Sequence, residues 1–545
     1  MGYTAEPLEL PKGGTIPQLL LESNVNDVPP ETPSIIDGVS GNVVYTYAAF
    51  RSAVKKVSAH LRTDIGISSG TVVGIMASNS YNYPVLVHGV LAAGGVVTAF
   101  NPLYQAQEIS HYLNLARPAF MIVDGSLASI LTAGLSIAQL DYTPELYLFS
   151  SEKTPEAGWK LLDLDNVILS GAGGLSPQLN VSHQDLAFIC FSSGTTGPMK
   201  GVYLTHGNIV ANIFQHRQRL SNMFGKGNNT VAALITPFFH ILGLGVFICQ
   251  YICQGIPIVV FPKFDLPLLL QAIPRDQITH INIVPPIALR LLQSSNADVD
   301  FTSVKCLINA AAPLNEVVSA ELSRRMGCKI TQWYGMTEAS PSVISQHEDE
   351  VGITGTVGRL LPGMSMKVVD SEGRDCGTNK SGELLIQGPN LMRGYVESPN
   401  ADPSDTFSEG FFKTGDIGYV DENDYVFLVG RSKELIKVKG NQVAPAELEA
   451  LLLSHAQVSD AAVRGIYFPD QETEYPAAYI TVDTGVTDVV QLTSEVESFV
   501  NKQVVKYKWL RGGVHIVPLI PRNASGKILR HQLPDPTKGK EHAKL

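Results

Sequence analysis

The sequence is short of several features, and each shortage excludes a class of protein. Cysteine occurs only six times in 545 residues, scattered along the chain, which excludes a dense disulfide scaffold and favours a reducing compartment. Lysine and arginine total 40 against 51 aspartates and glutamates. The resulting formal charge of -11 argues against bulk nucleic-acid binding, because phosphate contacts need a basic face.

Long uninterrupted apolar runs are also missing. The two most apolar stretches, 85–100 and 243–261, are broken by glycines and by polar or proline residues, so we expect no membrane span. The opening residues, MGYTAEPLELPKGG, lack the basic start and apolar core of a secretory signal. Cys249 and Cys253 have no second Cys or His pair at ligand spacing nearby, which favours core packing over a metal pair.

What the chain does contain is an alternation of short apolar runs with helical patterns. The runs TVVGIMASN and AFMIVDG precede such patterns over 83–93 and 126–138, and similar runs recur at AALITP, IPIVVFP, HINIVPP and KCLINAAAP. This alternation predicts an α/β fold of parallel sheets covered by helices. A chain of 545 residues exceeds what one hydrophobic core usually supports, so we expect at least two domains.

The sequence pattern changes twice toward its end. From about 355 to 430, short strands and turns such as GELLIQGP and YVFLVGR predict a β-rich subdomain. Beyond it, a helix opened by Pro445, strands at DAAVRGI and AAYITVD, and a helix over 494–505 predict an α+β region. We expect a large N-terminal domain and a small, mobile C-terminal domain, over 1–430 and 431–545.

The stretch CFSSGTTGPMKGVYLTHGNI, residues 190–209, has an unusual run of hydroxyl residues and glycines before Lys200. Such a loop offers backbone N–H groups and hydroxyls that can wrap a polyphosphate. A Walker P-loop needs glycine before the lysine, Ser or Thr after it, and a helix next. Here Met199 precedes the lysine, Gly201 follows it, and GVYLT continues as a strand, so the ordinary ATPase interpretation fails.

The segment FSSGTTGPMKGVYLTHGN resembles the phosphate loop of the adenylate-forming, or acyl-activating, superfamily, in particular acyl-CoA ligases resembling 4-coumarate:CoA ligase. Further motifs similar to the family's follow in its order over nearly the whole chain: TPFFHILG, QWYGMTEAS, KTGDIGYVDENDYVFLVGRSKELIKVKGNQVAPAELE and PRNASGKILR. The resemblance implies the adenylate-forming enzyme fold and a two-step reaction. A carboxylate attacks the α-phosphate of ATP to give acyl-AMP and pyrophosphate, and the CoA thiol then displaces AMP.

The resemblance implies roles for individual residues around ATP. Tyr334 would stack on adenine, Thr337 would touch the α-phosphate and Glu338 would coordinate Mg²⁺. Asp416 would accept hydrogen bonds from both ribose hydroxyls, with Arg431 as a second ribose contact. Taken alone, Tyr334 also fits a core position and Glu338 a solvated charge. The residues that would cradle the β- and γ-phosphates are Ser192, Ser193, Gly194, Thr195, Thr196, Gly197 and Lys200.

Two further residues resemble catalytic groups of the family. Lys527 would bridge the carboxylate and the α-phosphate as negative charge develops, although a lysine near a terminus is otherwise a solvated charge. His240 would lie beside the acyl carboxylate, positioning it rather than taking a proton, because that carboxylate is already ionised. Lys433 matches the family's hinge. Rotation there would present a CoA segment to the second half-reaction, with Lys437 and Gln442 as catalytic residues and Lys439 and Gly440 binding CoA.

The implied acyl pocket departs from the plant coumarate enzymes. Two residues after His240 those enzymes place a tyrosine and this chain has Leu242; before YGMTE they place a glycine and this chain has Trp333. Ala310 also replaces a glycine, and Gly335 completes the expected pocket. The pocket thus lacks the tyrosine hydroxyl and gains the indole ring of Trp333. These changes favour a substrate with a medium or long acyl chain, or a bulky prenylated or aryl-alkanoic acid.

Other activities share these motifs. A luciferase-like mono-oxygenase, an adenylating enzyme that loads a carrier protein and a non-catalytic binding protein are the alternatives. The final residues Ala543, Lys544 and Leu545 are similar to the Ser-Lys-Leu signal read by the peroxisomal import receptor. We therefore expect a peroxisomal protein, or otherwise a cytoplasmic one.

Overall fold

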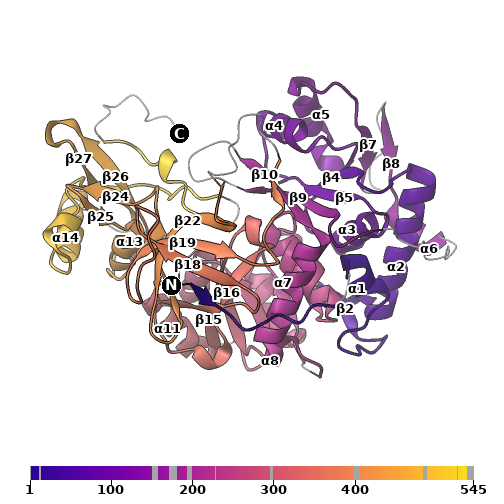
Figure 1. Ribbon diagram of the computed structural model, residues 1–545, viewed down its shortest axis with the longest axis horizontal. Helices are drawn as coiled ribbons and strands as arrows, with labels where there is room; N and C mark the ends of the chain where they lie inside the picture. Colours follow the sequence, from indigo (N-terminus) through magenta and orange to yellow (C-terminus); the bar gives the residue numbers. More distant parts are fainter. Residues whose placement is uncertain are drawn as a thin grey trace.

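Figure 1 shows the computed structural model of the chain. The residues it describes are 2–11, 14–149, 158–170, 181–192, 199–227, 229–294, 299–312, 314–396, 406–482, 488–523 and 526–536.

The first layer is an eight-stranded sheet with the order β20-β10-β9-β5-β4-β6-β7-β8. The six strands from β9 to β8 run parallel, whereas β10 is antiparallel to both β9 and β20. This confirms the parallel, helix-covered sheet predicted from the apolar runs. The strands are β4 (Val72–Met76), β5 (Val96–Ala99), β6 (Phe120–Val123), β7 (Glu145–Leu148), β8 (Trp159–Leu161), β9 (Leu186–Ser192), β10 (Lys200–Thr205) and β20 (Gly394–Tyr395).

Helices alternate with these strands along the chain and cover the sheet (Figure 1). Helix α2 begins after Thr46, whose hydroxyl accepts a hydrogen bond from the backbone of Ala49 and so satisfies one of the free N–H groups of the first turn. The helices are α2 (Tyr47–His60), α3 (Asn82–Ala92), α4 (Ala106–Ala116), α5 (Ala128–Ile137) and α6 (Leu164–Ser170), with the short turns η1 (Leu61–Ile65) and η2 (Gly125–Leu127).

The second layer is a fifteen-stranded sheet whose path is β1-β18-β19-β22-β23-β17-β16-β15-β14-β13-β11-β12-β2-β3, with β21 paired to β22. The strands from β15 to β2 run parallel. They are β2 (Pro33–Asp37), β11 (Ala232–Leu234), β12 (Ile258–Val260), β13 (His280–Ile283), β14 (Cys306–Asn309) and β15 (Lys329–Gly335), with β3 (Val43–Thr46) antiparallel at the edge.

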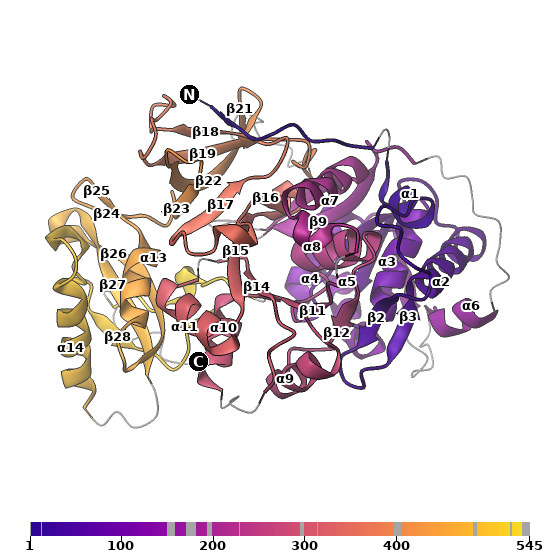
Figure 2. The same ribbon diagram turned by 90° about the horizontal axis from the view of Figure 1, so that it is seen from below.

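The β-rich segment continues this same sheet instead of standing apart from it. β16 pairs antiparallel with β15, with an irregular register between Tyr334 and Gly335, and β17 to β23 extend the antiparallel half. These strands are β16 (Ser342–Ser345), β17 (Thr356–Leu360), β18 (Ser365–Val369), β19 (Gly382–Gln387), β21 (Phe407–Ser408), β22 (Phe411–Val420) and β23 (Val426–Arg431). Figure 2 shows the N-terminal strand β1 (Tyr3–Thr4) lying beside β18.

The remaining helices of the N-terminal part include two with clear end signals. Asp265 caps α9, and a left-handed Gly327 ends α11. The segments are α1 (Ile16–Leu21), α7 (His206–Arg219), α8 (Ser221–Phe224), the π-helix η3 (Leu242–Tyr251), α9 (Leu266–Arg275), α10 (Pro285–Gln293), α11 (Glu316–Met326), η4 (Thr337–Ala339) and η5 (Glu348–Glu350).

The C-terminal part of the chain builds its own sheet and core. β26 pairs antiparallel with β27, which pairs parallel with β28, and apolar residues from this sheet and from α13 and α14 form one cluster. The elements are β24 (Ile436–Val438), β25 (Asn441–Val443), α13 (Pro445–Leu453), β26 (Val458–Phe468), η6 (Pro469–Gln471), β27 (Thr473–Val482), α14 (Val489–Asn501), η7 (Lys506–Lys508), β28 (Val514–Ile516) and η8 (Arg530–Gln532).

The bounds of the last long helix differ from the sequence prediction. The prediction placed it over 494–505, but α14 begins at Val489 because Asp488 accepts a hydrogen bond from the backbone of Gln491. It ends at Asn501, followed by the turn η7. Periodicity predicted the helix, and the Asp488 cap accounts for its earlier start.

Two predicted absences concern membranes and metals. Within the residues described, no helix has the length and apolar character needed to cross a bilayer. Cys249 and Cys253 are free thiols, both buried, which confirms core packing. Among the same residues no group of three or more His, Cys, Asp and Glu side chains is arranged around a metal-sized space.

Candidate active site

A buried carboxylate forms the centre of the candidate site. Asp416 on β22 accepts a hydrogen bond from the Tyr334 hydroxyl at 2.6 Å. It also forms an ion pair with Arg431, whose Nε lies 2.9 Å from Asp416 Oδ1. Asp416 and Arg431 are direct partners across β22 and β23, so the sheet register itself sets this pair. Three residues predicted to bind the nucleoside are therefore brought together from three strands.

Burial dominates the electrostatics of this cluster. It raises the pKa of Asp416 above its ordinary value, although Arg431 and the Tyr334 hydroxyl oppose the shift. Burial also raises the pKa of Tyr334 well above normal. A carboxylate with only a few neighbours and little water is a strong acceptor for any hydroxyl groups that enter the site.

Lys527 lies at the edge of the same cluster. Its Nζ is 3.7 Å from Glu434 Oε1, and its backbone N–H donates to Asn523 Oδ1 at 2.9 Å. Burial lowers the pKa of Lys527, with repulsion from Arg431 adding to the effect and attraction to Glu434 and Asp416 opposing it. The ammonium therefore lies within electrostatic reach of the buried Asp416–Arg431 pair, as the prediction for this residue requires.

Glu338 and Lys200 both contact one tyrosine. Glu338 in η4 is buried and its Oε1 accepts a hydrogen bond from the Tyr395 hydroxyl at 2.9 Å. Lys200 Nζ lies 4.5 Å from the centre of the Tyr395 ring. Thr337 next to Glu338 is also buried.

Most of the predicted phosphate loop is not described. Ser192 ends β9 and faces Lys200 of β10 in the antiparallel register, so the two ends of the loop are fixed. Lys200 itself is exposed. The residues between them, Ser193, Gly194, Thr195, Thr196 and Gly197, lie outside the described ranges.

His240 precedes the π-helix η3 and is half-buried. Burial lowers its pKa to about 4, so the ring is neutral near pH 7. The backbone N–H of Leu242 donates to His240 Nδ1 at 3.3 Å, which leaves the ring proton on Nε2. Asn79 holds the preceding loop through Phe238 N and Thr236 O, a support that the sequence motif did not reveal.

Three of the predicted acyl-pocket residues are apolar and buried. Leu242, Ala310 and Trp333 are all buried, and the His216 ring centre lies 4.4 Å from that of Trp333. A Cβ on Gly335 would lie 2.0 Å from the carbonyl oxygen of Pro341, so only glycine fits where β15 passes this residue.

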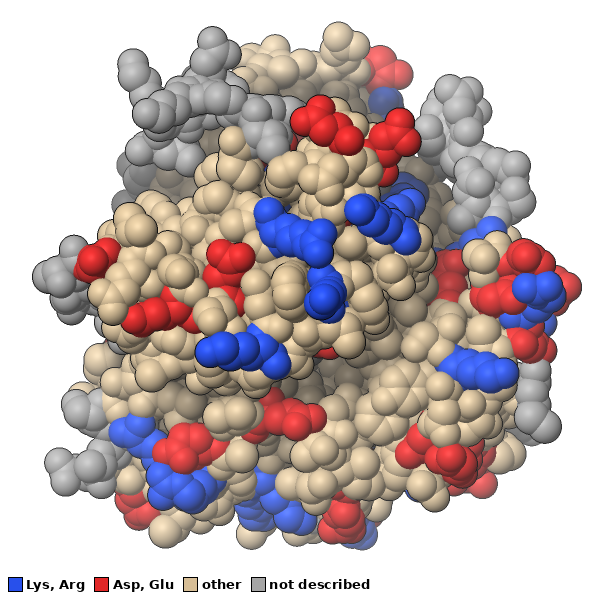
Figure 3. All heavy atoms as spheres, turned by 90° about the vertical axis from the view of Figure 1, so that its left-hand side faces the viewer, with Lys and Arg blue, Asp and Glu red and all other residues tan. Residues whose placement is uncertain are grey.

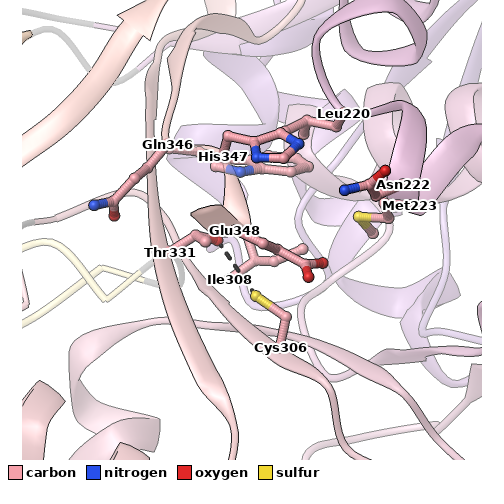
Figure 4. Close-up of a pocket in the computed structure, with 10 residues that line it drawn as sticks. Leu220, Asn222, Met223, Cys306, Ile308, Thr331, Gln346, His347 and Glu348 are labelled. Atoms are coloured by element: carbon pink, nitrogen blue, oxygen red, sulfur yellow. Dashed lines mark hydrogen bonds between the residues drawn. The ribbon is translucent and has the colours of Figure 1, made fainter. Parts of the chain in front are cut away.

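Trp333 lines a small pocket. Because successive side chains of a strand point to opposite faces of the sheet, this pocket lies on the face of β15 opposite Tyr334. Figure 4 shows its lining, which combines apolar side chains with polar ones such as His347 and Glu348. The lining residues are Leu220, Asn222, Met223, Cys306, Ile308, Thr331, Trp333, Gln346, His347 and Glu348.

The predicted CoA segment lies in the exposed hairpin of β24 and β25. Lys437 and Gln442 are cross-strand partners, and Lys439 and Gly440 form the turn with φ of 46° and 84°. Backbone N–H groups of Lys437 and Lys439 donate to the side chains of Glu474 and Thr473 on β27. Lys527 thus lies within electrostatic reach of Asp416 and Arg431, and among the described residues no hydrogen bond links the hairpin to that cluster.

Figure 3 views the face that carries the C-terminal part of the chain, where blue and red side chains are interspersed. The exposed basic residues of the hairpin belong to this region, and β25 contacts η7, which adds the exposed Lys506. Lys433, the predicted hinge, is also exposed.

Comparisons with known proteins agree with this arrangement. A family model for AMP-binding enzymes matches residues 21–396, and a model for the AMP-binding enzyme C-terminal domain matches residues 447–527. The chain belongs to the AMP-binding enzyme family. This confirms the family resemblance stated from the motifs.

Named relatives of this AMP-binding enzyme are CoA ligases. It is 35% identical over 534 residues to a probable 4-coumarate:CoA ligase 1 of Dictyostelium discoideum, covering 95% of each chain. It is 35% identical to the peroxisomal OPC-8:0-CoA ligase 1 of Arabidopsis thaliana, covering 92% of this chain and 90% of the relative. ATP-bound MatB from Rhodopseudomonas palustris superposes with a TM-score of 0.82 at 26% identity, over 95% of this chain and 98% of MatB. The adenylate-forming enzyme fold is therefore confirmed.

Proposed function

We propose that this AMP-forming acid:CoA ligase, which uses ATP, CoA and Mg²⁺, activates a lipophilic carboxylic acid through an acyl-adenylate. The observation that carries the proposal is the position of Lys527, an ammonium beside the buried cluster of Tyr334, Asp416 and Arg431. A cation there can stabilise negative charge that develops on an α-phosphate and an approaching carboxylate.

In the first step a carboxylate oxygen bonds to the α-phosphorus while the bond from that phosphorus to pyrophosphate breaks. Asp416 accepts hydrogen bonds from the ribose hydroxyls, and Arg431 adds a second contact. Tyr334 stacks on adenine and Thr337 contacts the α-phosphate. Ser192, Lys200 and the glycine and hydroxyl residues between them hold the departing phosphates, so this chain's task is mainly positioning and charge neutralisation.

Glu338 is the residue proposed to hold Mg²⁺. Mg²⁺ binds proteins through one or two carboxylates together with substrate phosphates, and the Tyr395 bond occupies only one of the two Glu338 oxygens. The buried carboxylate therefore fits the ion. When bound, Mg²⁺ neutralises phosphate charge.

His240 is proposed to orient the acid. Its neutral ring carries the proton on Nε2, a donor suited to an incoming carboxylate oxygen. Because the carboxylate arrives ionised, no proton needs to move at this atom. The residue thus holds the nucleophile in place and separates the acyl pocket from ATP.

The second step is proposed to follow a rotation of residues 431–545 about Lys433. The thiolate sulfur of CoA bonds to the acyl carbon, and the bond from that carbon to the AMP oxygen breaks. The exposed hairpin with Lys437, Lys439 and Gln442 offers charge and polar contacts to CoA, and Gly440 leaves room for pantetheine. The rotation is supported by the positions of these two groups: Lys527 lies near the Asp416 cluster, whereas the hairpin bonds to β27.

We propose that the acid substrate has an apolar chain or ring, because the residues proposed to line its pocket are apolar. Leu242 and Trp333 present carbon surface, and a buried methylene contributes about 0.8 kcal/mol whereas an unpaired buried hydroxyl costs about 1–3 kcal/mol. Medium and long aliphatic acids and bulky aryl-alkanoic acids should therefore be favoured over 4-coumarate.

The test is a panel of carboxylic acids incubated with the protein, ATP, Mg²⁺ and CoA. We expect AMP, pyrophosphate and acyl-CoA in equal amounts, with kcat/KM rising with apolar surface. Release of ADP, or a preference for 4-coumarate over every aliphatic and aryl-alkanoic acid, would contradict the proposal. Pyrophosphate release without CoA consumption would instead favour carrier loading, and light with a luciferin would favour a mono-oxygenase.

A peroxisomal address is proposed from Ala543, Lys544 and Leu545, which lie outside the described residues. A relative named as a peroxisomal CoA ligase supports it. A fluorescent protein fused at the N-terminus should appear in peroxisomes of a eukaryotic host and disperse when these three residues are deleted. An unchanged distribution after the deletion would refute the address.

A further inference from the structure

Tyr395 lies between two charged side chains that the proposed function assigns to the triphosphate and its cation. It donates a hydrogen bond to Glu338 at 2.9 Å from its hydroxyl, and Lys200 Nζ lies 4.5 Å from its ring centre. Within the described residues Lys200 and Glu338 form no ion pair with each other. Tyr395 thus links the two charged side chains.

The backbone around Tyr395 is fixed from both sides. Met392 N donates to Glu338 O at 2.8 Å, which ties the segment to η4. Arg393 N and Val396 N donate to Tyr203 O at 2.9 Å and Gly201 O at 2.7 Å, which ties it to β10. The ring therefore has a defined place relative to both charges.

The fit against β10 leaves little freedom. Tyr395 is the register partner of Val202, and a Cβ on Gly201 would lie 2.5 Å from a Val396 methyl carbon. Because β20 has only two residues, Gly394 and Tyr395, side-chain contacts and these backbone bonds together hold it in the sheet.

The chemistry of a tyrosine suits this position. The face of its ring attracts a cation, and its hydroxyl donates to a carboxylate. Lys200 and Glu338 carry opposite charges, and a direct ion pair between them would reduce the charge that each can offer a ligand. One rigid ring holds the ammonium on its face and the carboxylate at its hydroxyl.

We propose that Tyr395 is a positioning residue for the first half-reaction, holding Lys200 toward the triphosphate and Glu338 toward the accompanying cation. The inference rests on the proposed roles of those two residues. Its consequence is that Tyr395 acts on nucleotide binding in two separable ways, through its hydroxyl on the cation and through its ring on the phosphates.

The test measures equilibrium binding of α,β-methylene-ATP, which cannot be cleaved at the reacting bond, with and without Mg²⁺. Tyr395→Phe removes only the hydroxyl, so affinity with Mg²⁺ should fall about tenfold, the order expected for a hydrogen bond to a charged group. Without Mg²⁺, the affinity of this variant should stay within about twofold of the wild-type affinity, because the phenyl ring still offers its face to Lys200. Tyr395→Leu should weaken binding under both conditions.

Tyr425→Phe is the matched control. Arg359 lies 4.3 Å from the Tyr425 ring centre, so this tyrosine also carries a cation on its face but stands outside the site. It should bind the analogue as the wild type does. The reaction of supplied acyl-AMP with CoA should be unchanged in Tyr395→Phe, because that step uses neither the triphosphate nor its cation.

The inference is overturned if Tyr395→Phe binds the Mg²⁺ analogue like the wild type while Glu338→Gln binds it weakly. Equal loss of both half-reactions in Tyr395→Phe would also overturn it, because that result indicates a general structural role. The proposed function fails separately, if the wild type releases ADP instead of AMP. Should Tyr395→Leu not fold in a thermal melt, the Phe variant decides.

Discussion

His216 should make the N-terminal part of the chain unstable in mild acid. Its side chain is fully buried, and neither ring nitrogen has a hydrogen-bond partner among the described residues. Burial lowers its pKa from 6.5 to about 3, so the folded protein holds it neutral. Below pH 6.5 the unfolded chain binds a proton here that the folded chain does not, and stability is lost as the pH falls.

The size of the effect follows from linkage. Between about pH 7.5 and about pH 5.5 this one residue should cost about 1.4 kcal/mol of unfolding free energy. His88 and His206 are also buried, with their pKa values lowered to about 4, so the wild type should lose several kcal/mol over this range. His216→Met removes the titrating group and fills its space with a flexible apolar side chain.

Urea unfolding at these two pH values measures the change in unfolding free energy. Trp333, which packs against His216, is the reporter after Trp159 and Trp509 are replaced by phenylalanine. The His216→Met variant should lose about 1.4 kcal/mol less than its parent on acidification. The exposed His531→Met should lose as much as the parent. If His216→Met loses as much unfolding free energy on acidification as the parent does, the claim that His216 is buried in its neutral form is refuted.

Three other substitutions test the site. Lys527→Ala should lower acyl-AMP formation at least about a hundredfold, as for other electrostatic donors, yet leave a supplied acyl-AMP reactive with CoA; equal loss in both assays would refute its placement. Gly440→Val should do the reverse, slowing thioester formation and sparing adenylation, and slower adenylation would contradict the hairpin's role. Trp333→Gly should raise the kcat/KM for 4-coumarate relative to apolar acids, by the loss of apolar contact; an unchanged ratio would remove this residue from the pocket.

Local pattern predicted the parallel half of the fold well. Apolar runs such as AFMIVDG and HINIVPP became β6 and β13, because a strand buried on both faces needs a continuous apolar sequence. The helix after Pro445 was likewise predicted, since proline at the first turn marks a helix start. These features depend on residues close together in sequence.

Long-range pairing was not predictable from such patterns. The β-rich segment continues the parallel sheet through β15 and β16, and β1 joins it beside β18. Nothing within a short window of sequence specifies which distant strand a given strand will pair with. Tyr395 was missed for the same reason, because only the pairing of β20 with β10 brings it to Lys200 and Glu338.

The motifs predicted the centre of the site but not its electrostatics. Tyr334, Asp416 and Arg431 are in direct contact, and Lys527 lies within electrostatic reach of Asp416 and Arg431. The Glu434 partner of Lys527, and the burial that raises the pKa of Asp416, come from packing across strands and loops that the sequence leaves unspecified.

The central claim is that a carboxylate oxygen attacks the α-phosphorus of ATP. Incubating the protein with Mg²⁺, ATP, CoA and an accepted acid labelled with oxygen-18 in its carboxylate measures this directly, by mass spectrometry of the AMP released. The account predicts one labelled oxygen in AMP and none in pyrophosphate. Unlabelled AMP, or label in inorganic phosphate released with ADP, would contradict it.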